Sequence, residues 1–314
     1  MTFRLGVDVG GTFTDLLLVD DSSGQTYTAK VPSTPEDSSI GVLDGINRIC
    51  SQSDIDLSEV AQVMHGTTVA TNAVLTGKGA KVGLITTKGY RQVLQVARSF
   101  CPGGLGGWVS YVKAPLLAPL ELTIEADERM GADGKTVSSL DKDSLKSDLE
   151  KLNSENKIEA LTICFINSYV NGDHEVQAKE IAKNVLGDIP ISISSEVVPE
   201  MQEYERTETT VVNSYVRPQV AKYVTNLQNS LQDKMGSDVN LAILRSDGGL
   251  ASGRAAAESP VNLLLSGPAG GVAGAMYFCQ RGGFENILTF DMGGTSTDVA
   301  LIQDLSLIHI SEPT

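Results

Sequence analysis

The sequence predicts an α/β fold, and three features carry this prediction. Apolar runs typical of buried strands alternate with stretches whose apolar residues have helical spacing. Glycine-rich turns directly follow several of the strand-like runs. An eight-residue motif occurs twice, as DVGGTFTD at Asp8–Asp15 and as DMGGTSTD at Asp291–Asp298, and six of its eight positions are identical. The chain therefore contains two copies of one strand–turn–strand unit.

The individual elements follow from local patterns. A buried strand, the glycine-rich turn and two further strands form a hairpin at the start of the chain. A loop rich in glycine and proline occupies Ser99–Pro119, His174 should begin a surface helix, and a long helical stretch should be bent or broken at Pro218. The expected strands are 3–9, 16–20, 25–31, 158–169 and 189–197, and the expected helices are 38–50, 145–157, 174–187 and 203–236.

The composition indicates a globular, negatively charged protein. A chain of 314 residues can bury a sizeable core and is long enough for two domains. Acidic residues outnumber basic residues by 39 to 24, and the net charge is −15, so we expect no nucleic-acid partner. The four cysteines have no zinc or redox spacing, and we see neither a signal peptide nor an apolar run of the roughly 20 residues that span a bilayer. We expect a cytoplasmic protein with reduced thiols.

The repeated motif has the features of a magnesium–phosphate site. Glycines after a strand allow the backbone to approach a ligand, and consecutive N–H groups in such a turn bind anions. The carboxylates that end the two strands, Asp8 and Asp291, would repel a phosphate unless Mg²⁺ lies between them. Two copies would grip a polyphosphate from both sides, and the alternative is a duplicated hairpin without a ligand. The hydroxyl donors of the motif are Thr12, Thr14, Thr295 and Thr297.

Other polar residues admit two interpretations. Asp15 and Asp298 close the two motifs, and each could fix its turn by side-chain-to-backbone hydrogen bonds. His65 either faces a ligand or is an ordinary hydrogen-bonded loop histidine, and we favour the second interpretation. Asp247, followed by two glycines, either lines a cleft or forms a turn.

Six stretches together resemble the hydantoinase A / 5-oxoprolinase family of the actin-like ATPase superfamily. They are GVDVGGTFTD, HGTTVATNAVLTGKGAKVGLITTKGYRQVL, EYERTETTVVNSYVRP, SDGGLAS, PVNLLLSGPAGGVAGA and FDMGGTSTDVAL, in the order of the family. The resemblance implies an α/β, actin-like (ribonuclease H-like) ATPase fold that is incomplete at the C-terminus. The implied regions are an N-terminal region at 3–195, the start of the ATPase region at 200–303 and a non-native tail at 304–314.

The resemblance also implies an activity, which is the ATP-dependent opening of a cyclic amide such as 5-oxoproline or a hydantoin. The amide oxygen would attack the γ-phosphoryl group of ATP. The alternatives are the ATP-using subunit of a ketone carboxylase and a non-catalytic protein that switches with ATP. The implied partners are the cyclic amide, a hydantoinase B-type domain or subunit, and further copies of the chain in a homo-oligomer. We expect the intact protein to be active and this chain to be an inactive fragment.

The same resemblance implies the site residues, with ATP and Mg²⁺ as cofactors. Asp8 and Asp291 are the implied catalytic residues and orient Mg²⁺ through water. The resemblance also allows Asp291 or Asp298 to act as a base, and the alternative for Asp298 is the structural role in its turn. The stretch Ser266–Met276 matches the helix that connects the two domains of such ATPases. The implied phosphate-binding residues are Gly10, Gly11, Thr12 and Thr14 on one side and Gly293, Gly294, Thr295 and Gly270 on the other.

Three features depart from the family pattern. Gln92 stands where family members carry an acidic residue, and the loop Phe100–Trp108 is an addition. These two departures point away from 5-oxoproline itself, and the loop is expected to be a lid or a subunit interface. The end of the chain, LSLIHISEPT, resembles translated adapter sequence, and the alternative is a genuine return strand.

Overall fold

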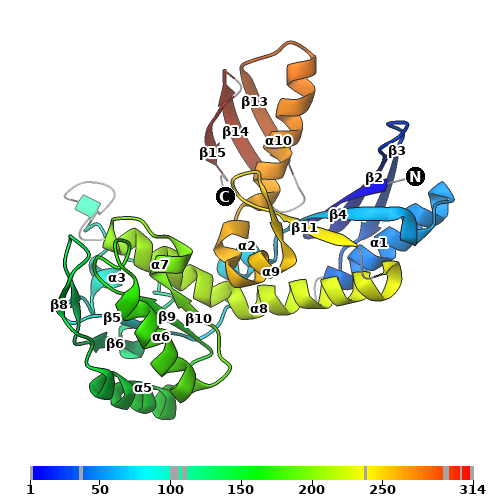
Figure 1. The fold of residues 1–314 in the computed structure, drawn as a ribbon. Helices are drawn as coiled ribbons and strands as arrows, with labels where there is room; N and C mark the ends of the chain where they lie inside the picture. Colours follow the sequence, from blue (N-terminus) through cyan, green and yellow to red (C-terminus); the bar gives the residue numbers. More distant parts are fainter. Residues whose placement is uncertain are drawn as a thin grey trace. The chain divides into compact units, whose positions relative to one another are not determined.

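The computed structural model describes residues 3–34, 38–99, 106–107, 112–236, 239–292, 297–304 and 306–311, the last range for its backbone only. Its helices and strands form a mixed α/β fold, as the sequence predicted (Figure 1). Contacts between residues divide the chain into two compact units. The first unit combines Met1–Leu75 with Gln219–Thr314, and the second unit is Thr76–Pro218, so the second is inserted into the sequence of the first.

The first unit contains a six-stranded sheet that begins with the predicted hairpin. Strands β1 to β3 form an antiparallel meander. Strand β4 pairs in parallel with β1, β11 pairs in parallel with β4, and β12 pairs antiparallel with β11 at the edge of the sheet. Burial alternates along β1 and β2, as expected of strands with one covered face. Helix α1 (Ser38–Ser53) covers that face. The strands are β1 (Phe3–Val9), β2 (Phe13–Asp20), β3 (Thr26–Pro32), β4 (Val60–Thr67), β11 (Asn240–Leu244) and β12 (Leu250–Ser252).

The second copy of the motif forms a separate three-stranded sheet in the first unit. Strands β13 (Ile287–Met292), β14 (Thr297–Gln303) and β15 (Ser306–Ser311) are antiparallel and lie in that order. Helix α10 (Ser266–Arg281) packs on one face of this sheet through a small core of Val272, Ala300 and Ile302. The backbone of β15 pairs with β14. The origin of residues 304–314 stays a prediction.

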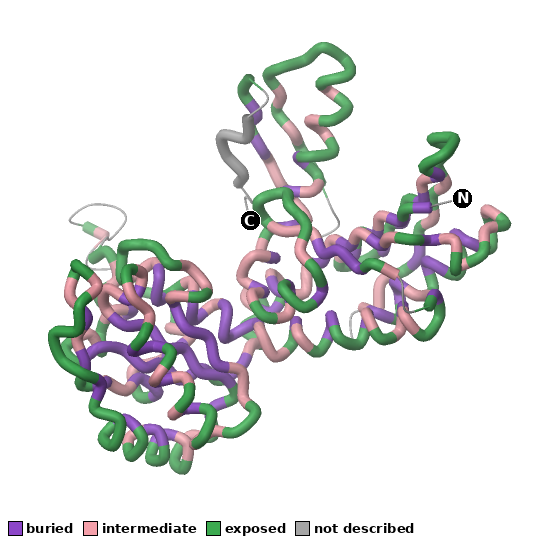
Figure 2. The backbone as a smooth tube through the Cα atoms, viewed as in Figure 1, coloured by how far each residue is buried: buried purple, intermediate pink, exposed green. Residues whose placement is uncertain are grey.

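The second unit has a parallel sheet at its centre, with the order β10-β9-β5-β6. Every residue of β5, β9 and β10 is buried, which is typical of a parallel sheet covered on both faces (Figure 2). Helices α5 and α6 contribute apolar side chains to this core, and each fully buried leucine or isoleucine contributes roughly 1.5–3 kcal/mol. The elements are β5 (Val82–Thr87), β6 (Thr123–Ala126), α5 (Lys142–Asn156), β9 (Ala160–Cys164), α6 (Asp173–Leu186) and β10 (Ile191–Ile193).

Short elements complete the described part of the chain. The helices are α2 (Val69–Leu75), α3 (Val93–Val96), α7 (Ser194–Val197) and α9 (Gly253–Glu258), and the strands are β7 (Arg129–Met130) and β8 (Thr136–Ser138). Three 3-10 turns lie at Leu57–Glu59, Leu120–Leu122 and Pro260–Leu263. Two predicted strands are shorter than expected: the one at 158–169 ends at Cys164, and the one at 189–197 gives way to α7 after Ile193.

Helix α8 (Glu203–Met235) continues through Pro218, so the predicted break is wrong, and the predicted bend stays a prediction. A proline inside a helix removes one backbone hydrogen bond, and a long helix tolerates this loss when its neighbours are well packed. Val216 and Val220, on either side of Pro218, are fully buried. No helix of the described residues is both long and apolar enough to cross a membrane.

Buried charges in the second unit have several partners each. Glu175 accepts hydrogen bonds from the backbone N–H of Phe165 (2.8 Å) and the hydroxyl of Ser194 (2.6 Å). Arg206 donates to the carbonyl oxygens of Phe165 (2.8 Å) and Glu200 (2.8 Å). Because these charges are satisfied, they fasten α6 and the start of α8 to the carboxyl ends of β9 and β10.

His174 begins α6 as predicted, but it is not on the surface. It is 5 % exposed, and its Nδ1 lies 2.7 Å from Oε2 of Glu128. The other oxygen of Glu128 accepts a hydrogen bond from the hydroxyl of Thr87, and all three residues are buried. The contact between His174 and Glu128 leaves no local sequence pattern, because the two residues are far apart in the chain. The sequence showed only that His174 begins a helix, and we therefore expected a solvated side chain.

Replacing Gly79 by alanine should destabilise the second unit. A Cβ at Gly79 would lie 2.2 Å from Cε1 of Tyr215, whose ring is itself buried and cannot move aside freely. We expect Gly79→Ala to lower the free energy of unfolding by about 1–3 kcal/mol in urea titrations. Gly274→Ala is the control, because its Cβ would meet nothing within 4 Å and alanine favours the helix. An equal loss in both variants would contradict this packing.

Candidate functional site

The first copy of the motif forms a tight turn between β1 and β2. Asp8 pairs with Asp15 across the ladder, and the N–H of Gly10 donates to the carbonyl oxygen of Phe13 (3.0 Å). A Cβ at Gly10 would lie only 3.1 Å from that same oxygen, so the turn favours glycine there. Gly11 and Thr12 are exposed, and a Cβ at Gly11 would meet nothing within 4 Å. The tip of the turn is therefore open to a ligand.

Thr14 lies on the other face of the sheet from Asp8. It is fully buried, and its hydroxyl lies 3.0 Å from the hydroxyl of Ser33, which donates to the carbonyl oxygen of Gly10 (2.8 Å). Since the Ser33 proton is used in that bond, Thr14 is the donor to Ser33. Through Ser33, Thr14 thus stabilises the turn from the buried face of the sheet. The predicted role of its hydroxyl as a donor to phosphate does not fit this buried position.

The second copy repeats the register of the first. Asp291 pairs with Asp298 and Met292 with Thr297, as Asp8 pairs with Asp15 and Val9 with Thr14. The predicted phosphate-binding residues Gly293, Gly294 and Thr295 lie outside the described residues. The strands on both sides of them nevertheless show that the two copies are hairpins of the same register, with connections of the same length.

The carboxyl group of Asp8 lies in an environment that disfavours its charge. The Asp8 residue as a whole is exposed, but protein atoms crowd its carboxyl group, and this loss of water is the main cause of its raised pKa. The negative charges of Asp15 and Asp291 raise the pKa further, and Lys30 opposes them. Charges of both hairpins therefore act on one carboxyl group, which is a common property of functional sites.

A glycine that sequence reasoning did not select makes room for Asp8. Gly66 of β4 pairs with Asp8 in the parallel ladder, and a Cβ at Gly66 would lie 3.3 Å from Oδ1 of Asp8. That approach is tighter than usual, so any larger residue would push the carboxyl group away. The signal was present in the sequence, because Gly66 follows a strand-like run in MHGTT.

Within the first unit, helix α10 contacts the second hairpin and the strands β4 and β11 of the six-stranded sheet. A Cβ at Gly271 would lie in ordinary contact, 3.5 Å, with Oδ2 of Asp291, and the hydroxyl of Ser266 donates to the carbonyl oxygen of Thr67 (3.3 Å). Gly270 lies at a packing contact, and its role in phosphate binding stays a prediction. Its Cβ would lie 2.5 Å from Cδ2 of Leu244, so glycine at this position lets α10 pack closely on β11.

The carboxylates suit a magnesium ion that keeps its water. The described residues contain no group of three or more side chains that could hold a metal ion directly. Mg²⁺ usually keeps several waters and binds through one or two carboxylates together with substrate phosphates. Asp8 and Asp291 offer two such carboxylates, and a cation there would relieve the repulsion that raises the pKa of Asp8. The residues present therefore fit water-mediated binding of Mg²⁺.

His65 is an ordinary hydrogen-bonded histidine, as we favoured, but it lies in a strand and not in a loop. It lies inside β4, is fully buried, and its Nε2 lies 2.7 Å from the hydroxyl of Tyr223. Burial lowers the pKa of His65 to about 4, so the imidazole is neutral at physiological pH. It belongs to the core beneath the site.

Asp247 forms a turn, which was one of its two interpretations. Its Oδ1 accepts a hydrogen bond from the N–H of Gly249 (2.9 Å), and Gly248 has a positive φ of 79°. Arg245 forms an ion pair with Asp247 (2.8 Å) across the β11–β12 connection. These contacts account for the DGG sequence without a ligand.

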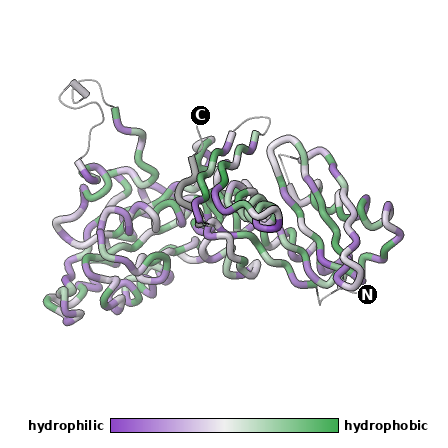
Figure 3. The backbone as a smooth tube through the Cα atoms, turned by 90° about the horizontal axis from the view of Figure 1, so that it is seen from above, coloured by the Kyte–Doolittle hydropathy of each residue, from purple (hydrophilic) through white to green (hydrophobic). Residues whose placement is uncertain are grey.

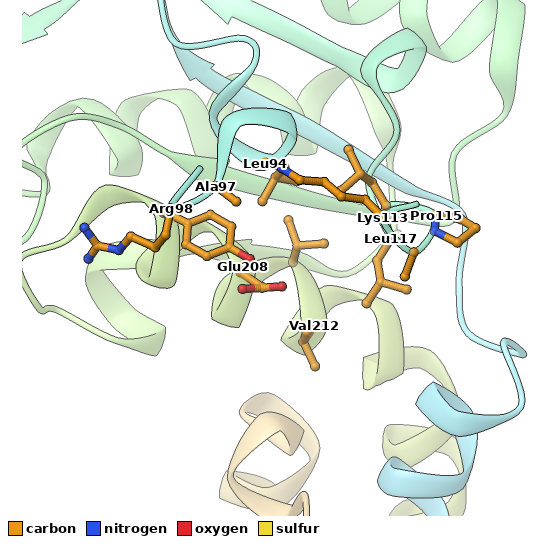
Figure 4. Close-up of a pocket in the computed structure, with 12 residues that line it drawn as sticks. Leu94, Ala97, Arg98, Lys113, Pro115, Leu117, Glu208 and Val212 are labelled. Carbon is orange, nitrogen blue, oxygen red and sulfur yellow. The ribbon is translucent and has the colours of Figure 1, made fainter. Parts of the chain in front are cut away.

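A cavity of about 340 Å³ lies in the second unit and had no sequence signal (Figure 4). Its walls are largely apolar and come from α3, the segment 113–117 and the first turns of α8, with Glu208 and Lys113 among the lining residues. Arg98 also lines it and is held by two hydrogen bonds to Glu205 (2.6 and 2.8 Å). The predicted loop Phe100–Trp108 lies outside the described residues except for Gly106 and Gly107.

Two hairpins that share one register and the DxGGT motif, on an α/β frame, define an actin-like ATPase fold. The chain belongs to the hydantoinase/oxoprolinase family. Residues 4–186 match the hydantoinase/oxoprolinase N-terminal region, and residues 206–314 match the hydantoinase/oxoprolinase region that follows it.

Relatives with assigned names include a caprolactamase subunit and a 5-oxoprolinase. The chain is 34% identical to the caprolactamase subunit alpha of Pseudomonas jessenii over 95% of its own length and 43% of that protein. It is 31% identical to 5-oxoprolinase of Dictyostelium discoideum over 99% of its own length and 28% of that protein. The chain thus spans less than half the length of these relatives.

Solved structures agree with this assignment. The nucleotide-free structure of acetone carboxylase, from a study of ATP-dependent acetone carboxylation, matches with a TM-score of 0.87 at 27% identity, over 96% of this chain and 44% of that chain. The ATP-dependent caprolactamase of Pseudomonas jessenii matches with a TM-score of 0.84 at 30% identity, over 98% of this chain and 47% of that chain. The α/β, actin-like ATPase fold expected from the sequence is confirmed.

Burial of His65 makes the fold sensitive to acid. The pKa of His65 is about 4 in the folded state, against an ordinary value of 6.5, so the unfolded chain binds the proton first as the pH falls. The stability contributed by neutral His65 is complete above pH 6.5 and is lost as the pH falls toward 4, in total by about 3 kcal/mol. His65→Gln should flatten the unfolding free energy between pH 6.5 and 4 in urea titrations. An unchanged slope would show that His65 does not cause it.

The raised pKa of Asp8 has the opposite consequence for stability. Above its folded pKa, the charged carboxylate is less favourable in the folded state than in the unfolded state. Asp8→Asn should therefore raise the free energy of unfolding at pH 7, and its advantage should shrink as the pH falls through the folded pKa. Asp21→Asn is the control, because Asp21 pairs with Arg4 (2.6 Å) and loses a favourable contact. Urea titrations at pH 7 and pH 4 measure both variants, and a destabilised Asp8→Asn would refute this account.

Proposed function

We propose that the intact protein uses ATP to open the ring of a cyclic amide. The observation that carries the proposal is the duplicated hairpin, in which Asp8 and Asp291 occupy equivalent positions and the charge of Asp291 acts on Asp8. Such a concentration of carboxylates beside an open glycine turn suits a magnesium-bound polyphosphate. The relationship to a 5-oxoprolinase and to an ATP-dependent caprolactamase supports a cyclic amide as the second substrate.

The reaction requires activation, because an amide carbonyl is a poor electrophile. The amide oxygen attacks the γ-phosphorus of ATP, an O–P bond forms, the bond to the bridging oxygen breaks and ADP leaves. Water then adds to the activated carbon, and the C–N bond breaks to release the ring nitrogen as an amine. A second water hydrolyses the resulting acyl phosphate to a carboxylate and inorganic phosphate.

The residues of the two hairpins would position the reactants. Gly10, Gly11 and Thr12 present the open turn to the phosphates on one side, and the same roles on the other side fall to Gly293, Gly294 and Thr295. Asp8 and Asp291 would hold Mg²⁺ through water. When bound, the ion neutralises charge on the phosphates. Phosphoryl transfer depends mainly on such positioning and charge stabilisation.

An ATP-using subunit of a ketone carboxylase is the second candidate, favoured by the match to acetone carboxylase at a TM-score of 0.87. Its first step would also be attack of an oxygen on the γ-phosphoryl group, in this case the oxygen of an enolate. The two candidates differ in the second substrate. ADP release stimulated by 5-oxoproline, caprolactam or a hydantoin supports the first candidate, and release stimulated by acetone or acetophenone with bicarbonate supports the second.

The names of relatives support an assembly. The chain is similar to a caprolactamase subunit alpha, an acetophenone carboxylase gamma subunit and an acetone carboxylase beta subunit. We propose that the intact protein works with a hydantoinase B-type domain or subunit and forms a homo-oligomer. Co-purification of the intact protein with the product of a neighbouring gene tests this.

Asp8→Ala and Asp291→Ala should each abolish ATP hydrolysis by the intact protein. Loss of transition-state charge stabilisation typically lowers kcat by about 10²–10³-fold or more. The measurement is ADP release with Mg²⁺ and a cyclic amide, with circular dichroism to show that the fold remains. Asp21→Ala, at the other end of the first hairpin, should retain full activity. Unchanged hydrolysis in either site variant would remove the role assigned to the hairpins.

A further inference from the structure

The cavity of the second unit combines apolar walls with few polar groups, which is the usual composition of a small-molecule site. Its volume of about 340 Å³ lies near the lower end of the range for such sites, which is roughly 300–1,000 Å³. The described residues that line it all belong to the second unit. Figure 3 shows hydrophobic (green) and hydrophilic (purple) stretches alternating along this unit, and the lining contains both kinds. The apolar walls include Leu94, Leu116, Leu117, Val211 and Val212.

Of the three charged side chains among the described lining residues, the two cations have partners within the protein. The guanidinium of Arg98 donates two hydrogen bonds to Glu205 (2.6 and 2.8 Å), and it points away from the apolar side chains in Figure 4. The ammonium of Lys113 donates to the carbonyl oxygens of Gln95 and Val96, a common arrangement at the C-terminal end of a helix. Both cations are thus engaged in contacts of the protein itself.

The third charged side chain, Glu208, is not engaged in this way. Within the described part of the chain, its carboxylate takes part in no hydrogen bond or ion pair. Figure 4 shows this carboxylate among the apolar side chains of the cavity, between Leu94 and Val212 in that view. A carboxylate accepts hydrogen bonds through both oxygens, and its bonds to cationic donors are the stronger ones. Glu208 is therefore the group of the cavity that can select a ligand by its charge.

The backbone beside the cavity has an uncommon conformation. Ala97 lines the cavity and has a φ of 50°, and Ser99, two residues further along the chain, has a φ of 51°. Positive φ angles are uncommon for residues other than glycine, and such strained positions cluster at active sites and ligand clamps. The strain at Ala97 and Ser99 agrees with a ligand site at this place.

We propose that the cavity binds a small molecule with an apolar body and a single ammonium group, and that the ammonium pairs with Glu208. The apolar walls take the body of the ligand out of water. An anionic ligand is disfavoured, because Arg98 and Lys113 are engaged and Glu208 would repel it. A neutral apolar ligand would take water from Glu208 without giving it a partner. This proposal does not depend on the proposed function.

Three probes with the same ring and different charges test the proposal. Cyclohexylamine is a cation at pH 7, cyclohexanol is neutral and cyclohexanecarboxylate is an anion. Their affinities for the 314-residue chain are measured by ligand-observed NMR titration at about 150 mM salt, which screens long-range attraction to the acidic protein. Glu208→Gln removes the charge of the proposed partner. Glu203→Gln is the matched control, because Glu203 lies on the same helix and is not among the described residues that line the cavity.

We expect cyclohexylamine to bind at least about tenfold more tightly than either other probe, and Glu208→Gln to remove this advantage without weakening the binding of cyclohexanol. Glu203→Gln should leave all three affinities unchanged. Equal affinities for the amine and the alcohol, or a preference for the carboxylate, would overturn the proposal. So would the absence of binding by every probe, an amine preference that survives Glu208→Gln, or an equal effect of the two substitutions. Since no ATP is present, these results leave the proposed function untouched.

Discussion

The first unit depends on the register of its two hairpins. In a strand, side chains alternate between faces, so a slip of one residue would turn Asp8 toward the core and Val7 and Val9 toward solvent. The bond from the N–H of Gly10 to Phe13 and the support from Ser33 and Thr14 hold the turn in this register. A short glycine turn thus decides both which residues form the core and where the carboxylates lie.

The cost of this arrangement is electrostatic. The carboxyl group of Asp8 has lost water, and the negative charges of Asp15 and Asp291 repel it. Gly66 leaves space for this carboxyl group beside strand β4. A fold selected for stability alone would not gather these carboxylates, and functional sites commonly carry such strain. A divalent cation bound between these carboxylates would replace the repulsion by attraction. In the proposed function, the raised pKa of Asp8 and the open turn beside it belong to one site.

The sequence predicted what depends on neighbours along the chain. Alternating apolar residues and glycine turns predicted the hairpins, and the repeat predicted that Asp8 and Asp291 are equivalent. It did not predict contacts between residues far apart in sequence. The contact of Gly270 with Leu244 was not predicted, and His174 was placed on the surface, because Leu244 and Glu128 are remote from these residues in the chain.

The same limit explains why the second copy is harder to interpret than the first. Strand β13 presents Asp291 on one face and Leu288 and Phe290 on the other, because side chains alternate along it. In β1 the apolar face is buried, and the strand that carries Asp8 is paired on both edges. A carboxylate can be held accurately only when the strand beneath it is packed and paired in this way. The position of the Asp291 carboxylate therefore depends on the packing of the opposite face of β13. A packed apolar face on β13 and a well-positioned carboxylate at Asp291 are one structural requirement.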